Sequence, residues 1–167
     1  MSYDCRAVAN AILDNGDALG IRLTHMAVHK VMYYAHGWRL AEHGCPLIQQ
    51  EFEAWKDGPV QRLVYNCLKL AGAKPVTMRA THFDLVTRQT STLSCDFKGG
   101  EEAFLRQIVA GYGHLHAFEL STMTHERGGP WDQVWNAPNG RVCMGMTIEH
   151  DAIRRHFLQS GMARRTA

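Results

Sequence analysis

The sequence predicts a mainly α-helical fold, a single compact domain of about five to seven helices with a small β-hairpin or extended element. Three observations lead to this prediction. Apolar residues recur at helical spacing in several long stretches, an alternating apolar pattern is confined to one short region, and no repeated βαβ pattern is present. The chain has 167 residues, of which 46% are hydrophobic and 20% charged. One hydrophobic core is therefore sufficient to stabilise it.

Two helices are expected near the N-terminus. The first covers residues 4–15, where Asp4 is a suitable N-cap and an Asn-Gly pair ends the helix. The second follows Thr24 and ends at Gly44, and apolar residues surround it so fully that it should be largely buried. Residues 47–55 leave the helical pattern and are expected to form a short extended segment.

The middle of the chain is expected to contain one helix and one hairpin. An Asp-Gly-Pro turn at 57–59 would lead into the helix, because proline suits the first helical turn. From Val60 onwards, apolar residues recur at i, i+3, i+4, i+7 and i+8 until Gly72 ends the pattern. Alternating residues over 83–97 then predict a β-hairpin with its turn at 89–91.

The second half is expected to hold the remaining helices. Helical patterns cover residues 101–112, 117–124 and 131–135. Thr147 is expected to cap a last helix, which carries apolar residues as far as Phe157. A small hydroxyl residue would be the usual cap before the helix at 117, but the sequence has a histidine there.

Composition and cysteine spacing limit the class of protein. The net charge is +2, which argues against nucleic-acid or membrane binding through bulk charge. The longest apolar run, residues 31–35, is far too short to span a membrane, and no secretory signal is expected. Five cysteines without a CxxC pair favour reduced thiols in a cytoplasmic protein over a disulfide framework or a zinc knuckle.

No set of residues predicts chemistry. His25 and His29 share one helix face and have a spacing that can bind zinc, but Met26 stands where an HExxH motif needs glutamate. Surface or capping histidines are the favoured interpretation. No nucleophile elbow and no phosphate-binding loop is present. The chain is therefore not expected to be an enzyme, and no catalytic residue, cofactor site or metal site is assigned.

Two stretches of aromatic, glycine and proline residues are more distinctive. The first is residues 30–41, followed by Phe52-Glu53-Ala54-Trp55-Lys56-Asp57-Gly58-Pro59-Val60; the second is Leu120-Ser121-Thr122-Met123-Thr124-His125, followed by Pro130-Trp131. Together they resemble the Panacea domain of SocA-like antitoxins, a domain also found in many phage- or mobile-element-associated proteins. The motif residues expected to hold the fold are Tyr34, Trp38, Trp55, Gly58, Pro59, Thr124, Pro130 and Trp131.

The resemblance implies a fold boundary and a function. The Panacea domain would span residues 3–158, and residues 159–167 would form a basic flexible tail. Members of the family are small cytosolic antitoxins of bacterial and phage toxin–antitoxin pairs. The expected function is neutralisation of a cognate toxin, encoded nearby, by direct protein–protein binding. One branch of the family implies an alternative, a proteolytic adaptor that presents its toxin to a cytosolic AAA+ protease.

A DNA-binding regulator is a third hypothesis, based on charge distribution. From Asp151 to the C-terminus there are four arginines and one aspartate, which gives +3, whereas the rest of the chain carries 14 basic and 15 acidic residues, which gives −1. A basic end can contact nucleic acid. The favoured interpretation is that these arginines complement a helix dipole and keep the chain soluble, so a nucleic-acid partner is not expected.

Loop residues are the expected contact points for a protein partner, because loops carry function more often than the elements that they connect. The candidates lie in the turn after Trp55 and in the loop that follows Thr124. The sequence leaves the oligomeric state open, including a homodimer. The candidate partner-binding residues are Lys56, Asp57, His125, Glu126 and Arg127.

Overall fold

The computed structural model describes residues 2–137 and 146–165, with side chains as far as Gly161. The described part is mainly α-helical, as predicted, with seven α-helices, one 3-10 helix and two small antiparallel sheets. The helices are α1 (Cys5–Ala18), α2 (His25–His43), α3 (Arg62–Leu68), η1 (Lys69–Ala71), α4 (Glu101–Tyr112), α5 (Ala117–Thr124), α6 (Pro130–Trp135) and α7 (His150–Arg165). The strands are β1 (Phe52–Trp55), β2 (Gly58–Val60), β3 (Thr81–Phe83), β4 (Thr90–Thr92) and β5 (Met146–Ile148).

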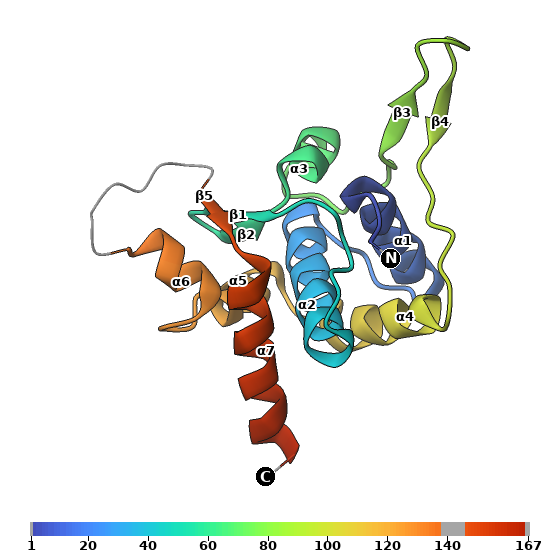
Figure 1. The fold of residues 1–167 in the computed structure, drawn as a ribbon. Helices are drawn as coiled ribbons and strands as arrows, with labels where there is room; N and C mark the ends of the chain where they lie inside the picture. The colour runs from blue at the N-terminus through green and yellow to red at the C-terminus, as the bar shows by residue number, and fades with distance from the viewer. Residues whose placement is uncertain (1, 138–145, 166–167) are drawn as a thin grey trace.

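Helix α2 is the centre of the fold (Figure 1). Thr24 caps its N-terminus by accepting a hydrogen bond from the amide of Ala27, and Gly44 ends it in a left-handed conformation with φ 67°. Helices α1, α4, α5 and α7 all pack against it. Helix α2 is therefore largely buried, as its apolar residues predict, and none of the described helices is long and apolar enough to cross a membrane.

Helix α7 lies beside α2, and the two approach closely at one point. A Cβ atom on Gly37 would come within 2.3 Å of the Phe157 ring, so only glycine fits there. The expected cap at Thr147 is wrong, because Thr147 pairs with Glu53 in the sheet and α7 begins later, at His150. The described part of the expected tail, residues 159–165, continues α7 as helix.

Strands β1, β2 and β5 form a three-stranded sheet in the order β2-β1-β5. The turn expected to lead into a helix at 57–59 is instead the end of a hairpin, in which Ala54 pairs with Pro59 and Trp55 with Gly58. The helix α3 starts only at Arg62. Proline is tolerated in β2 because β2 is an edge strand, whose outward amide has no partner to lose.

The predicted hairpin in the middle of the chain is confirmed, but its register is wrong. Thr81 pairs with Thr92 and Phe83 with Thr90, so the turn lies at 84–89. Asp84 sets this turn because its carboxylate accepts hydrogen bonds from the amides of Val86 and Thr87. We call residues 81–92 the β-arm, since they project away from the helical body (Figure 1).

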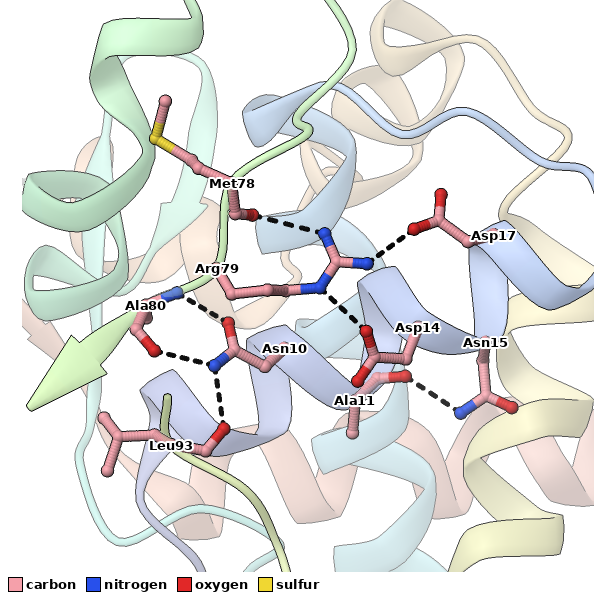
Figure 2. Close-up of polar contacts among 9 residues, drawn as sticks. All are labelled: Asn10, Ala11, Asp14, Asn15, Asp17, Met78, Arg79, Ala80 and Leu93. Carbon is pink, nitrogen blue, oxygen red and sulfur yellow. Dashed lines mark hydrogen bonds and ion pairs between the residues drawn. The ribbon is translucent and has the colours of Figure 1, made fainter. Parts of the chain in front are cut away.

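The base of the β-arm is held by polar contacts with α1 (Figure 2). The Asn10 amide donates to the carbonyls of Ala80 and Leu93, both at 2.8 Å, and accepts from the amide of Ala80 at 2.7 Å. Asn10 is buried, so these bonds satisfy a side chain that burial would otherwise penalise. Beside it, Arg79 forms ion pairs with Asp14 at 2.7 Å and Asp17 at 2.5 Å.

The connection to α5 uses the histidine found where a hydroxyl residue would be usual. The Nδ1 atom of His116 accepts a hydrogen bond from the amide of Phe118. The Glu119 carboxylate accepts in return from the His116 amide, which completes a capping box. The departure from the usual cap therefore leaves the helix start intact.

Candidate partner-binding site

The tip of the β1–β2 hairpin is exposed but firmly supported. Lys56 and Asp57 are exposed, and helices α5 and α6 hold the backbone beneath them. The Ser121 hydroxyl donates to the carbonyl of Asp57 at 2.7 Å, and the Trp131 indole donates to the carbonyl of Trp55 at 2.8 Å. The two charged side chains are thus presented on a fixed loop, which reduces the entropy lost on binding a partner.

A buried lysine lies directly beneath this tip. The side chain of Lys30, on α2, is 0% exposed and its amine donates to the carbonyl of Pro59 at 2.9 Å. Burial lowers the pKa of Lys30 to about 7, although the Asp57 carboxylate acts in the opposite direction. Lys30 therefore ties the central helix to the edge strand and places an ionisable group under the tip.

The motif residues Gly58 and Thr124 make room for this lysine. Gly58 has φ 103°, a backbone conformation that favours glycine. A Cβ atom there would come within 2.5 Å of the Thr124 hydroxyl oxygen and 2.9 Å of Lys30 Cε. The Thr124 hydroxyl in turn donates to the carbonyl of Ser121 at 2.7 Å. The glycine and the threonine are thus explained by close packing around the lysine.

His125 lies next to the tip and packs on α6. Its ring centroid is 3.9 Å from that of Trp131, which itself stacks on Trp135 at 5.5 Å, as the one-turn spacing of the two tryptophans predicts. Burial lowers the pKa of His125, and the Lys30 charge lowers it further, whereas Asp57 and the Lys56 backbone raise it. The structure therefore brings His125 together with Lys56 and Asp57 in one surface.

The remaining two candidates interact with helices α6 and α7. Glu126 is exposed, and its carboxylate lies 3.5 Å from Nε2 of His156 on α7 rather than at the hairpin. Arg127 is also exposed, and its charge lowers the pKa of the Asp132 carboxyl, after the larger effects of hydrogen bonds from Gly128 and Asn136. We call Lys56, Asp57, His125, Glu126 and Arg127 the tip surface, within which Glu126 marks the side towards α7.

The outer side of the hairpin carries a second polar cluster. The indole of Trp55 donates to the Glu53 carboxylate at 2.8 Å, and the Arg62 guanidinium donates to the same carboxylate at 2.8 and 2.9 Å. These bonds lower the pKa of Glu53, although burial raises it. The Trp55 ring also packs on Tyr65 at 4.9 Å between centroids. Trp55 is therefore fixed in place by contacts on two sides.

The motif aromatics Tyr34 and Trp38 lie on a different side of α2. The Trp38 indole donates to the hydroxyl of Tyr112 at 2.9 Å, and the Tyr34 ring stacks on that of Tyr112 at 4.4 Å. Both side chains also pack on Phe157, with a centroid distance of 5.1 Å for Trp38 and 5.8 Å for Tyr34. They join α2 to α4 and α7.

The histidine pair on α2 is involved in packing. The rings of His25 and His29 are perpendicular and 6.2 Å apart, and Nδ1 of His29 accepts from the amide of Gln61 at 3.3 Å. Burial, followed by the charge of Lys30, lowers the pKa of both imidazoles. Among the residues that the structure describes, no group of three histidine, cysteine or acidic side chains is arranged to hold a metal ion.

Sequence reasoning missed the part played by Lys30. The signal was present, because a lysine lies within the mainly apolar residues 27–37, which are all buried, and such a lysine needs a specific acceptor. Ser121 and Tyr112 were also missed as the partners of the hairpin and of Trp38. Both pairings join elements far apart in the sequence, and neither residue type is distinctive enough to indicate its partner.

Comparison with known proteins places the chain in a family. The family described as Antitoxin SocA-like, Panacea domain, matches residues 28–132, which include most of α2, the β1–β2 hairpin and the tip surface. The chain belongs to this family of SocA-like antitoxins with a Panacea domain.

One curated relative extends the match to most of the chain. It is Antitoxin SocA from Caulobacter vibrioides (strain NA1000 / CB15N), which is 35% identical over 156 residues. The aligned region covers 93% of this chain and 83% of the relative. No solved structure matches the chain.

Proposed function

We propose that the chain is the antitoxin of a toxin–antitoxin pair and neutralises its cognate toxin by direct protein–protein binding. The observation that carries the proposal is family membership over residues 28–132, together with the 35% identity to Antitoxin SocA. Such binding is stoichiometric, because a folded surface covers the toxin's active site or holds the toxin in an inactive form. An interface of about 1,200–2,000 Å² is typical of stable complexes.

The tip surface is the proposed contact region on this chain. The backbone of its hairpin part is fixed by bonds from Ser121 and Trp131, and its charged side chains are exposed. Preorganised loops lose little entropy on binding, and charged side chains around an interface guide encounter and specificity. A tip that is rigid at the backbone and charged at the side chains therefore suits specific recognition of a partner.

Co-expression with the product of the neighbouring gene tests the function. The neighbouring product alone should stop growth, and the wild-type chain should restore it and co-purify with the product at a fixed ratio. A neighbouring product that is harmless alone would contradict the proposal. So would a product that remains toxic beside this chain without forming a complex.

A double charge reversal, Lys56→Glu with Arg127→Glu, tests the contact region. Both side chains are exposed and neither contacts Lys30, so the fold should be preserved. We expect at least a tenfold increase in Kd, or about 1.4 kcal/mol, measured by calorimetry with the purified toxin. The matched control is Lys74→Glu with Lys98→Glu, two exposed lysines outside the tip surface. Equal affinity of the two double variants would exclude the tip surface from the interface.

Delivery of the toxin to a AAA+ protease is the alternative mechanism for the same complex. The measurement that separates the two mechanisms is the half-life of the toxin in cells with and without this chain. Under simple neutralisation the toxin is bound and its half-life does not shorten. A half-life that shortens only when both this chain and the protease are present would replace neutralisation with the adaptor mechanism.

A further inference from the structure

A groove with an aromatic floor runs between α2, α4 and α7. Two cavities of about 710 and 380 Å³ open along it, and Trp38, Tyr112 and Phe157 line both of them. Because these three side chains are shared, the two cavities are neighbouring parts of one feature. We call it the aromatic groove.

The floor of the aromatic groove is preorganised. The Trp38 indole is fixed by its hydrogen bond to the Tyr112 hydroxyl, and Phe157 packs edge-on against Trp38 with a centroid distance of 5.1 Å. Two glycines allow the helices on either side to approach: Gly37 faces the Phe157 ring, and a Cβ atom on Gly161 would lie 3.4 Å from Trp38. A ligand that binds here meets rigid aromatic faces and pays little ordering entropy.

The aromatic groove carries two carboxylates, and the basic side chain in its described lining is His156, whose Nε2 lies 3.5 Å from the Glu126 carboxylate. Glu42 lines the larger cavity and Glu126 the smaller one, and the described lining residues include no lysine or arginine. The two carboxylate side chains are 52% and 64% exposed, so they are accessible at the rim. Aromatic faces also attract cations through their quadrupole. Rim and floor are therefore both complementary to a positively charged partner.

The shape of the aromatic groove fits a helix. On α2 its lining residues are Tyr34, Trp38, Ala41 and Glu42, which follow helical spacing over about 12 Å of the axis. Helices α4 and α7 supply the walls of the larger cavity, and α4, α5 and α7 those of the smaller one, so the groove is bounded by helix surfaces, the geometry into which another helix packs. A short amphipathic helix with apolar anchors at i, i+3, i+4 and i+7 matches this length.

We propose that the aromatic groove binds a basic amphipathic helix of the toxin, whose apolar face covers Trp38 and Phe157 while its lysines or arginines meet Glu42 and Glu126. The inference rests on the proposed function, because it assigns the helix to the toxin. It is continuous with the tip surface, since Glu126 belongs to both. One bound toxin would then contact the hairpin tip and the groove together.

The first test uses a peptide, so that it does not depend on the toxin. A labelled helix of about 14 residues, with leucine on one face and lysine on the other, is titrated with the full chain by fluorescence anisotropy. We expect the double variant Glu42→Lys with Glu126→Lys to bind at least tenfold more weakly than the wild type. The control Glu51→Lys with Asp96→Lys makes the same change in net charge at exposed positions outside the groove, and should bind as the wild type does.

The second test uses the purified product of the neighbouring gene. The wild type should bind it, Glu42→Lys with Glu126→Lys should weaken binding at least tenfold, and the leucine–lysine peptide should compete with it. If the wild type binds but the variant binds equally well, the groove inference is overturned while the proposed function stands. If the wild type does not bind at all, the proposed function fails, and with it the assignment of the helix to the toxin.

A second variant fills the groove without changing charge. Gln107 is exposed on α4 and lines the larger cavity, so Gln107→Trp should obstruct binding of both the peptide and the toxin. Unchanged peptide affinity in this variant would overturn the inference. A leucine–glutamate peptide that binds as tightly as the leucine–lysine peptide would also overturn it. So would a wild-type dimer that Gln107→Trp converts to a monomer, because the occupant would then be a second copy of this chain.

Discussion

The amine of Lys30 donates a hydrogen bond to the carbonyl of Pro59 at 2.9 Å, and this bond joins the central helix α2 to β2, an edge strand of the three-stranded sheet. A charged amine at this depth would be strongly disfavoured, and burial accordingly lowers its pKa to about 7. The protonation of this side chain is therefore coupled to folding.

Replacement of this lysine should change how stability depends on pH. The folded pKa, about 7, lies below the ordinary value of 10.5, so the folded state binds fewer protons than the unfolded state between these values. Stability should therefore rise with pH across this window. We expect Lys30 to contribute about 1.5 kcal/mol to the increase between about pH 7 and 8.5. In Lys30→Met, urea unfolding at the two pH values should lack this contribution.

The control for this prediction is Lys56→Met, which removes an exposed lysine from the tip directly above Lys30. Its stability should show the same dependence on pH as the wild type. If Lys30→Met keeps the wild-type dependence, the buried amine is not the group responsible, and its pKa is close to the ordinary value.

Substitution of Gly58 should be more costly than substitution of a glycine with a similar backbone. Gly58→Ala combines backbone strain at φ 103° with a contact of 2.5 Å to the Thr124 hydroxyl, and should lower the free energy of unfolding by about 2–4 kcal/mol. Gly100 has φ 87° and open space around it, so Gly100→Ala should lose only about 1–2 kcal/mol. Equal losses in chemical denaturation would show that the contacts around Lys30 contribute nothing.

Removal of the Asn10 amide should loosen the base of the β-arm. Asn10→Ala leaves buried backbone groups of Ala80 and Leu93 without their side-chain partner. We expect a loss of about 1–3 kcal/mol and faster amide exchange in residues 81–92 by mass spectrometry. The comparison is Asp14→Asn, which breaks an exposed ion pair to Arg79 and should cost less than about 1 kcal/mol. Protection of the β-arm that is equal in both variants would contradict the assigned anchor.

Acid sensitivity should depend on His36. Burial, followed by the charge of His150, lowers the pKa of His36 to about 3. The unfolded chain therefore takes up a proton that the folded chain does not, and stability falls as pH decreases below about 6.5. In the wild type the amide of Ile48 donates to Nδ1 of His36. The variant His36→Asn keeps an acceptor for this amide, but its side chain does not titrate. We expect it to lose about 2 kcal/mol less than the wild type between about pH 6 and 4.5. A difference near zero by denaturant titration would contradict this prediction.

The helices and several of their ends were predictable because caps and apolar faces are encoded locally, but α1 continues to Ala18, past the Asn-Gly pair that was expected to end it. Asp4 and Thr24 cap α1 and α2 as expected, and Gly44 ends α2 where its sequence position indicates. The error at Pro59 has a physical cause: proline is compatible with both a first helical turn and an edge strand. Only the tertiary partners, β1 on one side and Lys30 on the other, select the strand.

Part of the grouping of the candidate residues was predictable from the sequence, whereas the contacts that fix them were not. The candidate residues of the tip surface were chosen from turn and loop signals, and three of them, the exposed Lys56 and Asp57 and the half-buried His125, lie together. What fixes them was not predictable, because it depends on pairings such as Ser121 with Asp57 and Trp131 with Trp55, which are 64 and 76 residues apart. Local patterns carry no information about such pairings.

The β-arm offers a practical position for observing the protein at work. Its tip residues Leu85 and Val86 are 84% and 92% exposed, and the arm is attached to the helical body through its base. A fluorophore or an inserted epitope at the tip should therefore leave the helical body unaltered. In Figure 1 the end of the β-arm is well separated from α7. A label at this end would therefore report on complex formation without occupying the aromatic groove, which α7 lines.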